Sequence, residues 1–354
     1  MHKFGEKAMP SVTIKDVARL AGVSPSTVSR VISNHPRISK ATAEKVRQAM
    51  ETLGYHPNMT AKKLVSKSTK TLGLVLPRSA EELFANPFFS EVLRGMLACA
   101  NQKQYDLLMS SANNPKEEME TVTRMVLGRQ VDGMILIKPR KADPVIEKLL
   151  ALDFPFVVLG RSLEHPGVPA VNNDNIAAAF DATFHLINQG HRRIGFVSGP
   201  PELVVSGDRL AGYQKALSQA KLPLRDEWVI ASDILPKNGF HAVSMVMNAP
   251  DRPTAFVVSD DVVAFGMIRE LVGAGYQIPE DVSVVGFNNI VLSELSNPPM
   301  TTVDIGIYHL GYQTARHLIR ILQGEKVPEP NVTVPHRLVI RQSVRFLPHA
   351  DDSL

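Results

Sequence analysis

The sequence predicts a small all-α helix-turn-helix head followed by an α/β body of two doubly wound lobes, each built on a parallel sheet. Three observations lead to this fold class: a basic N-terminal segment, short capped helices within it, and a later alternation of short apolar runs with amphipathic stretches. The chain has 354 residues, which is more than one hydrophobic core usually supports, so two or three domains are expected.

Charge is unevenly distributed along the chain. Residues 1–70 hold 13 Lys and Arg against 4 Asp and Glu, so this segment is strongly positive although the whole chain carries only +4. A basic head on an acidic body is typical of proteins that bind nucleic-acid phosphates. A solvated basic face would show the same charge, so charge alone leaves both interpretations open.

Three short helices are expected in the head. Thr13 and Asp16 have the spacing of a capping box, and the helix they start ends near Gly22. Ser24-Pro25 begins the second helix, because serine is a good cap and proline is tolerated at the first helical position. A third helix lies within 39–54. The short turn between the first two makes a helix-turn-helix unit, whose second helix is suited to a DNA major groove.

Apolar runs of four or five residues recur through the body, and amphipathic stretches separate them. They lie at 72–76, 106–109, 133–137, 156–159, 194–197, 255–258 and 282–285. Such runs are typical of parallel strands buried on both faces. The number of units exceeds one comfortable sheet, so we expect two lobes with a cleft between them.

The predicted domain boundaries follow these changes in pattern. The head spans 11–57, a basic linker or hinge helix spans 58–70, and the body spans 71–354. Within the body, the first lobe is expected at about 71–171 and 303–330, and the second at about 172–302 and 331–346. Residues 1–8 carry no structural signal, and whether they belong to the native start stays open.

Motifs along nearly the whole chain resemble those of the LacI/GalR repressors. They are TIKDVA at 13–18, GVS at 22–24, TVSRV at 27–31, QVDG at 130–133, GHRRIG at 190–195, RLAGY at 209–213 and PEDVSVVGF at 279–287. Residues 86–89, 159–161 and 287–289 further resemble the maltose-operon regulators of Gram-positive bacteria. The family resemblance implies a two-lobed body similar to periplasmic binding proteins.

The resemblance also implies which residues meet DNA. Positions 25, 26 and 30 would read bases, whereas Ser24, Thr27 and Asn34 would position the backbone. Leu64 matches the family residue that enters a base step and kinks the duplex, although the usual Ala-Arg-x-Leu is Ala61-Lys62-Lys63-Leu64 here. The full expected set is Thr13, Ser24, Pro25, Ser26, Thr27, Arg30, Asn34, Tyr55, Asn58, Ala61, Lys62 and Leu64.

An effector site is implied between the lobes, at the ends of strands. The expected residues are Phe88, Phe89, Arg161, Arg209, Asp260 and Asn288. Arginine and carboxylate groups can bond sugar hydroxyls, and an aromatic ring can pack on a pyranose, although either phenylalanine could instead belong to the core. Asn288 stands where many relatives have a carboxylate, so the ligand is expected to differ. Of the neighbours Asp260 and Asp261, one is expected to meet the ligand and the other to cap a helix.

No enzyme is expected, and no metal or cofactor. The chain lacks HExxH, Gly-x-Ser-x-Gly and P-loop motifs, and its one cysteine, Cys99, is predicted to be a buried structural thiol. No run approaches the roughly 18 apolar residues of a membrane span. The N-terminus has no apolar signal core, so a cytoplasmic location is expected.

The sequence therefore predicts a homodimeric transcription regulator, a repressor by resemblance, that binds double-stranded operator DNA. A small sugar, most simply maltose or a maltodextrin, is expected to switch it. The alternatives are control by a purine or a phosphoprotein corepressor, and a sugar-binding transport protein, which would need a secretion signal. The operator sequence, the exact effector and the sign of its effect stay open.

Overall fold

The computed structural model describes residues 12–33, 35–55, 68–76, 86–137, 139–231, 239–326 and 329–348, with the side chains of 239–242 excepted. Contacts between residues divide the chain into two compact units, 1–69 and 70–354, and each is described by itself. Among the described residues, no helix is long and apolar enough to cross a membrane.

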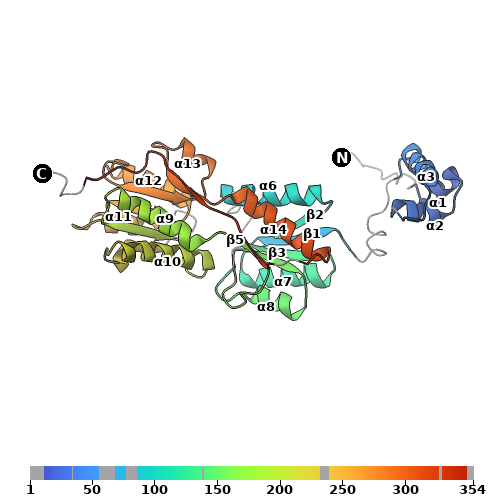
Figure 1. Cartoon of the computed structure of the whole chain (residues 1–354), viewed down its shortest axis with the longest axis horizontal. Helices are drawn as coiled ribbons and strands as arrows, with labels where there is room; N and C mark the ends of the chain where they lie inside the picture. Colours follow the sequence, from blue (N-terminus) through green and yellow to red (C-terminus); the bar gives the residue numbers. More distant parts are fainter. Residues whose placement is uncertain are drawn as a thin grey trace, which may run out of the picture. The chain divides into compact units, whose positions relative to one another are not determined.

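The first unit is a three-helix head. Its helices are α1 (Ile14–Ala21), α2 (Pro25–Ile32) and α3 (Lys40–Leu53) (Figure 1). Val17, Val28 and Val46 are fully buried at its centre, one from each helix, and Tyr55 packs against this cluster. The three predicted helices are therefore present, and one small core joins them.

The helix ends follow the signals in the sequence. The expected capping box is present, with the Asp16 carboxylate accepting hydrogen bonds from the backbone N–H (3.0 Å) and the hydroxyl (2.6 Å) of Thr13. Ser24 accepts from the N–H of Thr27 at the start of α2. Gly22 ends α1 with φ at 67°, a left-handed conformation that costs glycine little because it has no Cβ.

A six-stranded sheet of order β11-β5-β4-β3-β1-β2 forms the first lobe of the second unit, and all its strand pairs are parallel. Its strands are β1 (Thr71–Leu76), β2 (Asp106–Ser111), β3 (Gly133–Ile137), β4 (Phe156–Leu159), β5 (Ala170–Asn172) and β11 (Asn331–Thr333). Its helices are α6 (Pro87–Gln102), α7 (Pro115–Leu127), α8 (Pro144–Ala151) and α14 (Ile307–Leu322). In Figure 1, α6 and α14 lie on one side of this sheet and α7 and α8 on the other.

The second lobe has a sheet of order β12-β10-β9-β8-β6-β7, in which only the β10–β12 pair is antiparallel. Its strands are β6 (Ile194–Ser198), β7 (Val229–Ala231), β8 (Ala255–Val258), β9 (Ser283–Phe287), β10 (Thr301–Asp304) and β12 (Arg337–Val339). Its helices are α9 (Asn175–Asn188), α10 (Val204–Gln219), α11 (Gly239–Met247), α12 (Asp261–Gly273) and α13 (Val291–Leu295), with a short 3-10 helix η1 (Asp226–Trp228).

The predicted strands and the lobed body are confirmed, and the central strands are buried along their whole length. Two of the expected lobe boundaries are wrong. Residues 331–333 form β11, which pairs with β5 in the first lobe, although 331–346 was expected in the second. Residues 303 and 304 belong to β10 of the second lobe, so the chain returns to the first lobe only after Asp304. Both errors have one cause: short strands are placed by their pairing partners, which local sequence does not reveal.

Candidate functional site

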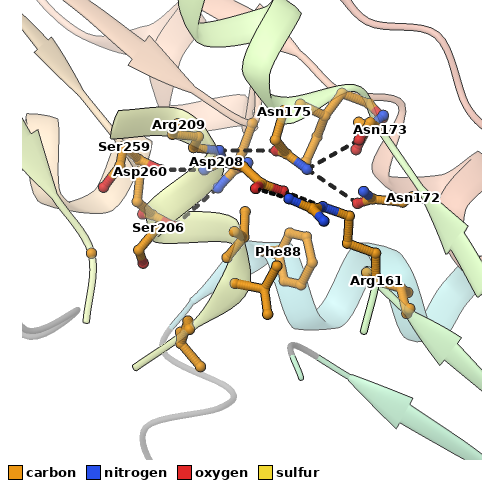
Figure 2. A pocket seen from close by; sticks show the side chains of 18 of the residues that line it. Phe88, Arg161, Asn172, Asn173, Asn175, Ser206, Asp208, Arg209, Ser259 and Asp260 are labelled. Carbon is orange, nitrogen blue, oxygen red and sulfur yellow. Dashed lines mark hydrogen bonds and ion pairs between the residues drawn. The ribbon is translucent and has the colours of Figure 1, made fainter. Parts of the chain in front are cut away.

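A pocket lies between the two lobes, near the carboxyl ends of their central strands (Figure 2). We call it the interlobe pocket. Five of the six residues expected at the effector site line it, namely Phe88, Arg161, Arg209, Asp260 and Asn288. Further polar lining comes from Asn172, Asn173, Asn175, Ser206, Asp208 and Ser259, and apolar lining from Leu159, Val204, Val263, Ile305 and Leu310. This is the location at which open α/β sheets usually bind ligands.

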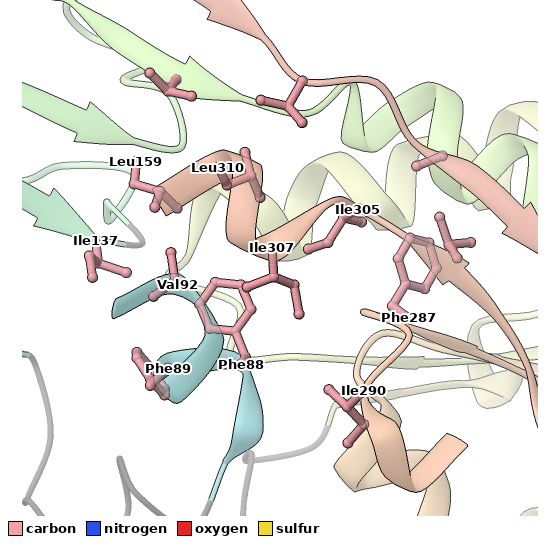
Figure 3. Close-up of a cluster of buried hydrophobic side chains, with 14 of the residues drawn as sticks. Phe88, Phe89, Val92, Ile137, Leu159, Phe287, Ile290, Ile305, Ile307 and Leu310 are labelled. Carbon is pink, nitrogen blue, oxygen red and sulfur yellow. The ribbon is translucent and has the colours of Figure 1, made fainter. Parts of the chain in front are cut away.

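Phe88 and Phe89 have different surroundings. Asn86 caps α6 by accepting a 2.9 Å hydrogen bond from the N–H of Phe88, and Pro87 occupies the first helical position. The two rings meet edge to face, with centroids 5.3 Å apart. Both rings lie in the buried apolar cluster of Figure 3, but only Phe88 also lines the pocket. The core alternative therefore holds for Phe89, whereas Phe88 belongs both to the core and to the pocket wall.

Arg209 is one of three buried charged residues of the pocket, together with Asp208 and Asp260. It lies on α10, and its guanidinium donates to the Asn175 side-chain oxygen (3.1 Å) and to the carbonyl of Ser259. The same group lies 4.3 Å from the centre of the Phe287 ring. Burial lowers the pKa of Arg209 to about 10, although nearby carboxylates oppose this shift. A buried arginine with a fixed hydrogen-bond set is well placed to read ligand oxygens, because its orientation is set in advance.

Asp260 accepts hydrogen bonds from both lobes and also caps a helix. One carboxylate oxygen accepts a 2.8 Å bond from the N–H of Val262 and so caps α12. The other accepts from the amides of Asn288 (3.0 Å) in the second lobe and Asn86 (3.4 Å) in the first. Asp260 therefore caps α12 and also lines the pocket, so it occupies both of the positions that were expected to be divided between it and Asp261.

Asp261 does not cap α12, although one of the two neighbouring aspartates was assigned that role apart from the other. Its carboxylate is fully buried and accepts hydrogen bonds from the hydroxyls of Ser293 (2.6 Å) and Thr302 (2.7 Å) and from the N–H of Ile290 (3.1 Å). Burial raises its pKa to about 7. A Cβ at Gly286 would lie only 2.2 Å from this carboxylate, so glycine is needed there for space. Asp261 thus fixes the start of α13, because the α12 cap is already made by its neighbour.

Arg161 pairs with a residue that the sequence analysis missed. It follows β4 in the first lobe and forms two hydrogen bonds with Asp208 on α10 of the second, one of them 2.8 Å long. The bond to Asp208 raises the pKa of Arg161. The Asp208 side chain is only 9% exposed, against 40% for Arg161. The pair therefore ties the lobes together at the pocket (Figure 2).

Backbone contacts also join the lobes beside the pocket. The N–H of Lys141 donates to the carbonyl of Glu202 (2.9 Å), and the N–H of Val204 donates to the carbonyl of Pro139 (3.2 Å). Both bonds join the loop after β3 to the segment that ends in the first residue of α10. The lobes are therefore held close together on this side in the present arrangement.

Three asparagines of the lining lie between the end of β5 and the start of α9 and were also missed. Asn173 donates to the carbonyls of Ile305 and Val334, both at 2.9 Å, and so ties together the segments that cross between the lobes. Asn175 donates to the side chain of Asn172 at 3.1 Å and accepts from Arg209. Polar residues directly after a buried strand were a usable signal, because ligand groups gather at such ends in parallel sheets.

The residues expected to read bases lie on the surface of the head. Pro25, Ser26 and Arg30 are exposed on α2, and Ser24 is exposed at its cap. Thr27 is half-buried and its hydroxyl lies 2.9 Å from that of Ser24, while Thr13 is exposed at the start of α1. The remaining predicted DNA contacts, Asn34, Asn58, Ala61, Lys62 and Leu64, lie outside the described residues.

Other chemistry-bearing groups are sparse in the described part of the chain. Cys99 is buried, as predicted, and burial raises its pKa. Glu147, Glu164 and His165 are close enough to hold an ion, but both glutamates are exposed, and such groups are common on protein surfaces. Neither feature lies at the interlobe pocket.

Comparison with protein families gives two matches. The profile described as bacterial regulatory proteins, lacI family, matches residues 13–58. The profile described as a periplasmic binding protein-like domain matches residues 183–344. The matches fall on the helix-turn-helix head and on the lobed body respectively.

Curated relatives cover almost the whole chain. HTH-type transcriptional regulator MalR of Streptococcus pneumoniae is 37% identical over 319 residues, which cover 89% of this chain and 94% of that protein. Catabolite control protein A of Priestia megaterium is 35% identical over 337 residues, covering 95% and 100% respectively. Both names describe regulators, which confirms the prediction that the chain is not an enzyme.

Two solved structures share the complete architecture. The transcriptional regulator CelR in complex with cellobiose matches with a TM-score of 0.73 and 33% identity, covering 94% of this chain and 99% of that one. The lac repressor dimer bound to operator and the anti-inducer ONPF matches with a TM-score of 0.83 and 27% identity, with the same coverage. The predicted fold class is therefore confirmed over both the head and the body.

Proposed function

Because this chain belongs to the lacI family of bacterial regulatory proteins and is a DNA-binding transcriptional regulator, we propose that it represses a carbohydrate-utilisation operon under the control of a small sugar. The observation that carries the proposal is the interlobe pocket. Its polar groups include paired guanidinium, carboxylate and amide side chains, and the Phe88 ring lies beside them. Sugars present hydroxyls to such groups and an apolar ring face to an aromatic side chain.

The charge of the pocket favours a neutral ligand. Arg161 and Arg209 bring two positive charges, and Asp208 and Asp260 bring two negative charges. The charges therefore balance, and an anionic ligand would have to displace existing pairs. Among solved relatives, CelR is described as a complex with cellobiose, a neutral sugar.

Maltose or a maltodextrin is the effector we propose. The support is the resemblance of residues 86–89, 159–161 and 287–289 to maltose-operon regulators, together with 37% identity to MalR. A phosphoprotein corepressor, the alternative that the sequence leaves open, is the second candidate. A purine would compete for the same pocket, with Phe88 as its stacking surface.

We further propose that the protein acts as a homodimer in the cytoplasm. The lac repressor to which it is similar is described as a dimer on its operator. Two heads would read two half-sites, with Arg30 at a base edge and Leu64 as the wedge in the minor groove. The short helix α13 exposes Val291 and Leu295, each 72% accessible, so this face is our candidate contact between copies.

Calorimetry on the full chain tests the ligand assignment. Maltose, maltotriose, glucose, trehalose, adenosine and guanine would be titrated separately, and a sugar is expected to give saturable heat. If only a purine binds, the pocket has been assigned to the wrong class of ligand. If a phosphoprotein binds while no sugar gives binding heat, the corepressor alternative is favoured.

A further inference from the structure

A second cavity adjoins the interlobe pocket. The two share Arg161, Asn172, Asn173, Asn175 and Asp208, so the Arg161–Asp208 ion pair stands in their common wall. The second cavity alone is lined by Ala170, Asp174, Ile176, Asn331, Val332 and Thr333, which come from β5, the start of α9 and β11. The interlobe pocket has a cavity volume of about 70 Å³, whereas the second cavity has about 300 Å³.

These volumes bear on what can bind. A water-sized group needs roughly 10–15 Å³ by this measure, so the interlobe pocket has room for about five such groups. One pyranose has more non-hydrogen atoms than that. In the present arrangement, most of the available space therefore lies beyond the ion pair.

The ion pair is built so that one partner can move. Asp208 is nearly buried on α10, whereas the Arg161 side chain is 40% exposed and reaches the pair from the loop after β4. Solvent screens only the Arg161 side of the pair, so Arg161 can leave if ligand hydroxyls donate hydrogen bonds to the nearly buried Asp208 carboxylate in its place. Movement of Arg161 away from Asp208 would join the two spaces.

The lining of the second cavity suits a neutral, hydroxyl-rich ligand. It carries amides and a hydroxyl from Asn172, Asn331 and Thr333 beside the carboxylate of Asp174, all of which can bond hydroxyls, and it has no aromatic side chain. Its polar floor is also connected to the first pocket. Asn172 accepts a hydrogen bond from Asn175 (3.1 Å), which in turn accepts one from Arg209 (3.1 Å). A ligand group at Asn172 would therefore be sensed by the buried arginine.

We propose that the two cavities form one binding site, gated by the Arg161–Asp208 pair, for a saccharide of at least two units. The first unit lies against Phe88 and Arg209 in the space that opens when Arg161 moves, because the closed interlobe pocket is too small for it, and the next unit lies in the second cavity against Asn172 and Thr333. This inference rests on the proposed sugar-controlled function and specifies which residues hold the second unit of the ligand.

Titration of the full chain with glucose, maltose, maltotriose and cellobiose tests the proposal. At least one disaccharide is expected to bind tenfold or more tightly than glucose. Thr333→Trp fills the second cavity from an exposed strand position, so it should remove this gain while glucose affinity stays within twofold. Asn331→Trp, on the same strand, should behave likewise. Glu329→Trp places the same bulk on an exposed residue outside both cavities and should leave all affinities unchanged.

The outcomes separate this inference from the function on which it rests. Equal affinity for glucose and both disaccharides in the parent protein would overturn the two-unit site but leave a sugar-controlled regulator. An equal loss of glucose and disaccharide binding in both tryptophan variants, with unchanged melting temperatures, would also overturn it. If none of the four sugars binds, the proposed sugar-controlled function is overturned, and this inference with it.

Discussion

The side-chain amide of Asn288 donates a 3.0 Å hydrogen bond to the carboxylate of Asp260, and both residues are buried at the interlobe pocket. This contact links the end of β9 to the first turn of α12. An amide can donate to a carboxylate, whereas a second carboxylate cannot unless it is protonated. The identity of residue 288 thus controls both the ligand surface and the electrostatic state of Asp260.

Asn288→Asp is expected to destabilise the body at neutral pH. Two carboxylates in contact repel each other, so the pKa of the pair rises in the folded state. The lost stability should therefore be largest at about pH 8 and should recover towards about pH 5, where the pair holds a proton. Thermal unfolding at both pH values measures it.

Asn289→Asp is the matched control for that variant. Asn289 accepts a 2.9 Å hydrogen bond from Arg341, so a carboxylate there keeps its partner. It should cost little at either pH. If Asn288→Asp is as stable as the parent protein at about pH 8, the hydrogen bond from Asn288 to Asp260 does not stabilise the body.

Arg209→Ala is expected to abolish the effect of the sugar on operator binding. The change removes the donor to Asn175 and to the Ser259 carbonyl, which should also cost roughly 1–3 kcal/mol of the body's stability. Operator affinity without sugar should stay close to that of the parent protein, because the residue belongs to the body. Fluorescence anisotropy with labelled operator, with and without sugar, measures both quantities. A variant that still responds fully would show that the arginine does not read the ligand.

Arg30→Ala is expected to cost about 1–3 kcal/mol of operator affinity and to relax the preference at one base pair in each half-site. Arg30 is exposed on α2, as a base-reading side chain must be. Arg19→Ala removes the same charge from α1, where the guanidinium pairs with Asp16, and should not relax sequence preference. Binding to a panel of operator variants gives the answer, and a uniform loss over the panel would identify Arg30 as a phosphate contact.

The pH dependence of the body's stability should reflect the titration of Asp261. Its pKa is about 7 in the folded protein, against an ordinary value of 3.8. Between these values the folded state holds a proton that the unfolded state has released, so this group makes stability fall as pH rises from about 4 to about 7. Asp261→Asn should flatten that part of the curve in urea unfolding. Glu280→Gln, at an exposed position, should leave it unchanged, and a parallel curve for Asp261→Asn would contradict the assignment.

Leu295→Lys is expected to shift the protein from dimer to monomer in analytical ultracentrifugation, because it places a charge on the exposed apolar face of α13. Ile340→Lys is the control, since Ile340 is also a largely exposed apolar residue, at 65%, but lies outside α13. A dimer that persists in Leu295→Lys would place the contact between copies on another face.

Sequence alone predicted the head and the central strands because their signals are local. Thr13 and Asp16 are three residues apart, and runs such as 133–137 are apolar at every position, as strands buried on both faces must be. The strand β11 was not predicted because it has only three residues, two of them polar, and joins the sheet only by pairing with β5.

The site was predicted in part for the same reason. Arg209 stands in the RLAGY motif and Asp260 follows the apolar run 255–258, but nothing in the local sequence distinguishes Asp208 from an ordinary helix carboxylate. Its role depends on Arg161, which is 47 residues earlier in the chain and in the other lobe. The division of labour between Asp260 and Asp261 likewise depends on Ser293 and Thr302, which only the folded chain brings together.

The most direct test of the central claim is the operator affinity of the full-length protein, measured by anisotropy at fixed salt, in the presence and absence of maltose. A ligand shifts the DNA-competent state only through its different affinity for the two lobe arrangements, and a nearly complete switch from 1:99 to 99:1 corresponds to about 5.5 kcal/mol. The account predicts tight, sequence-specific binding whose affinity changes at least tenfold on saturation with maltose or maltotriose, and no such change in Arg209→Ala. Specific operator binding that no sugar alters would contradict it.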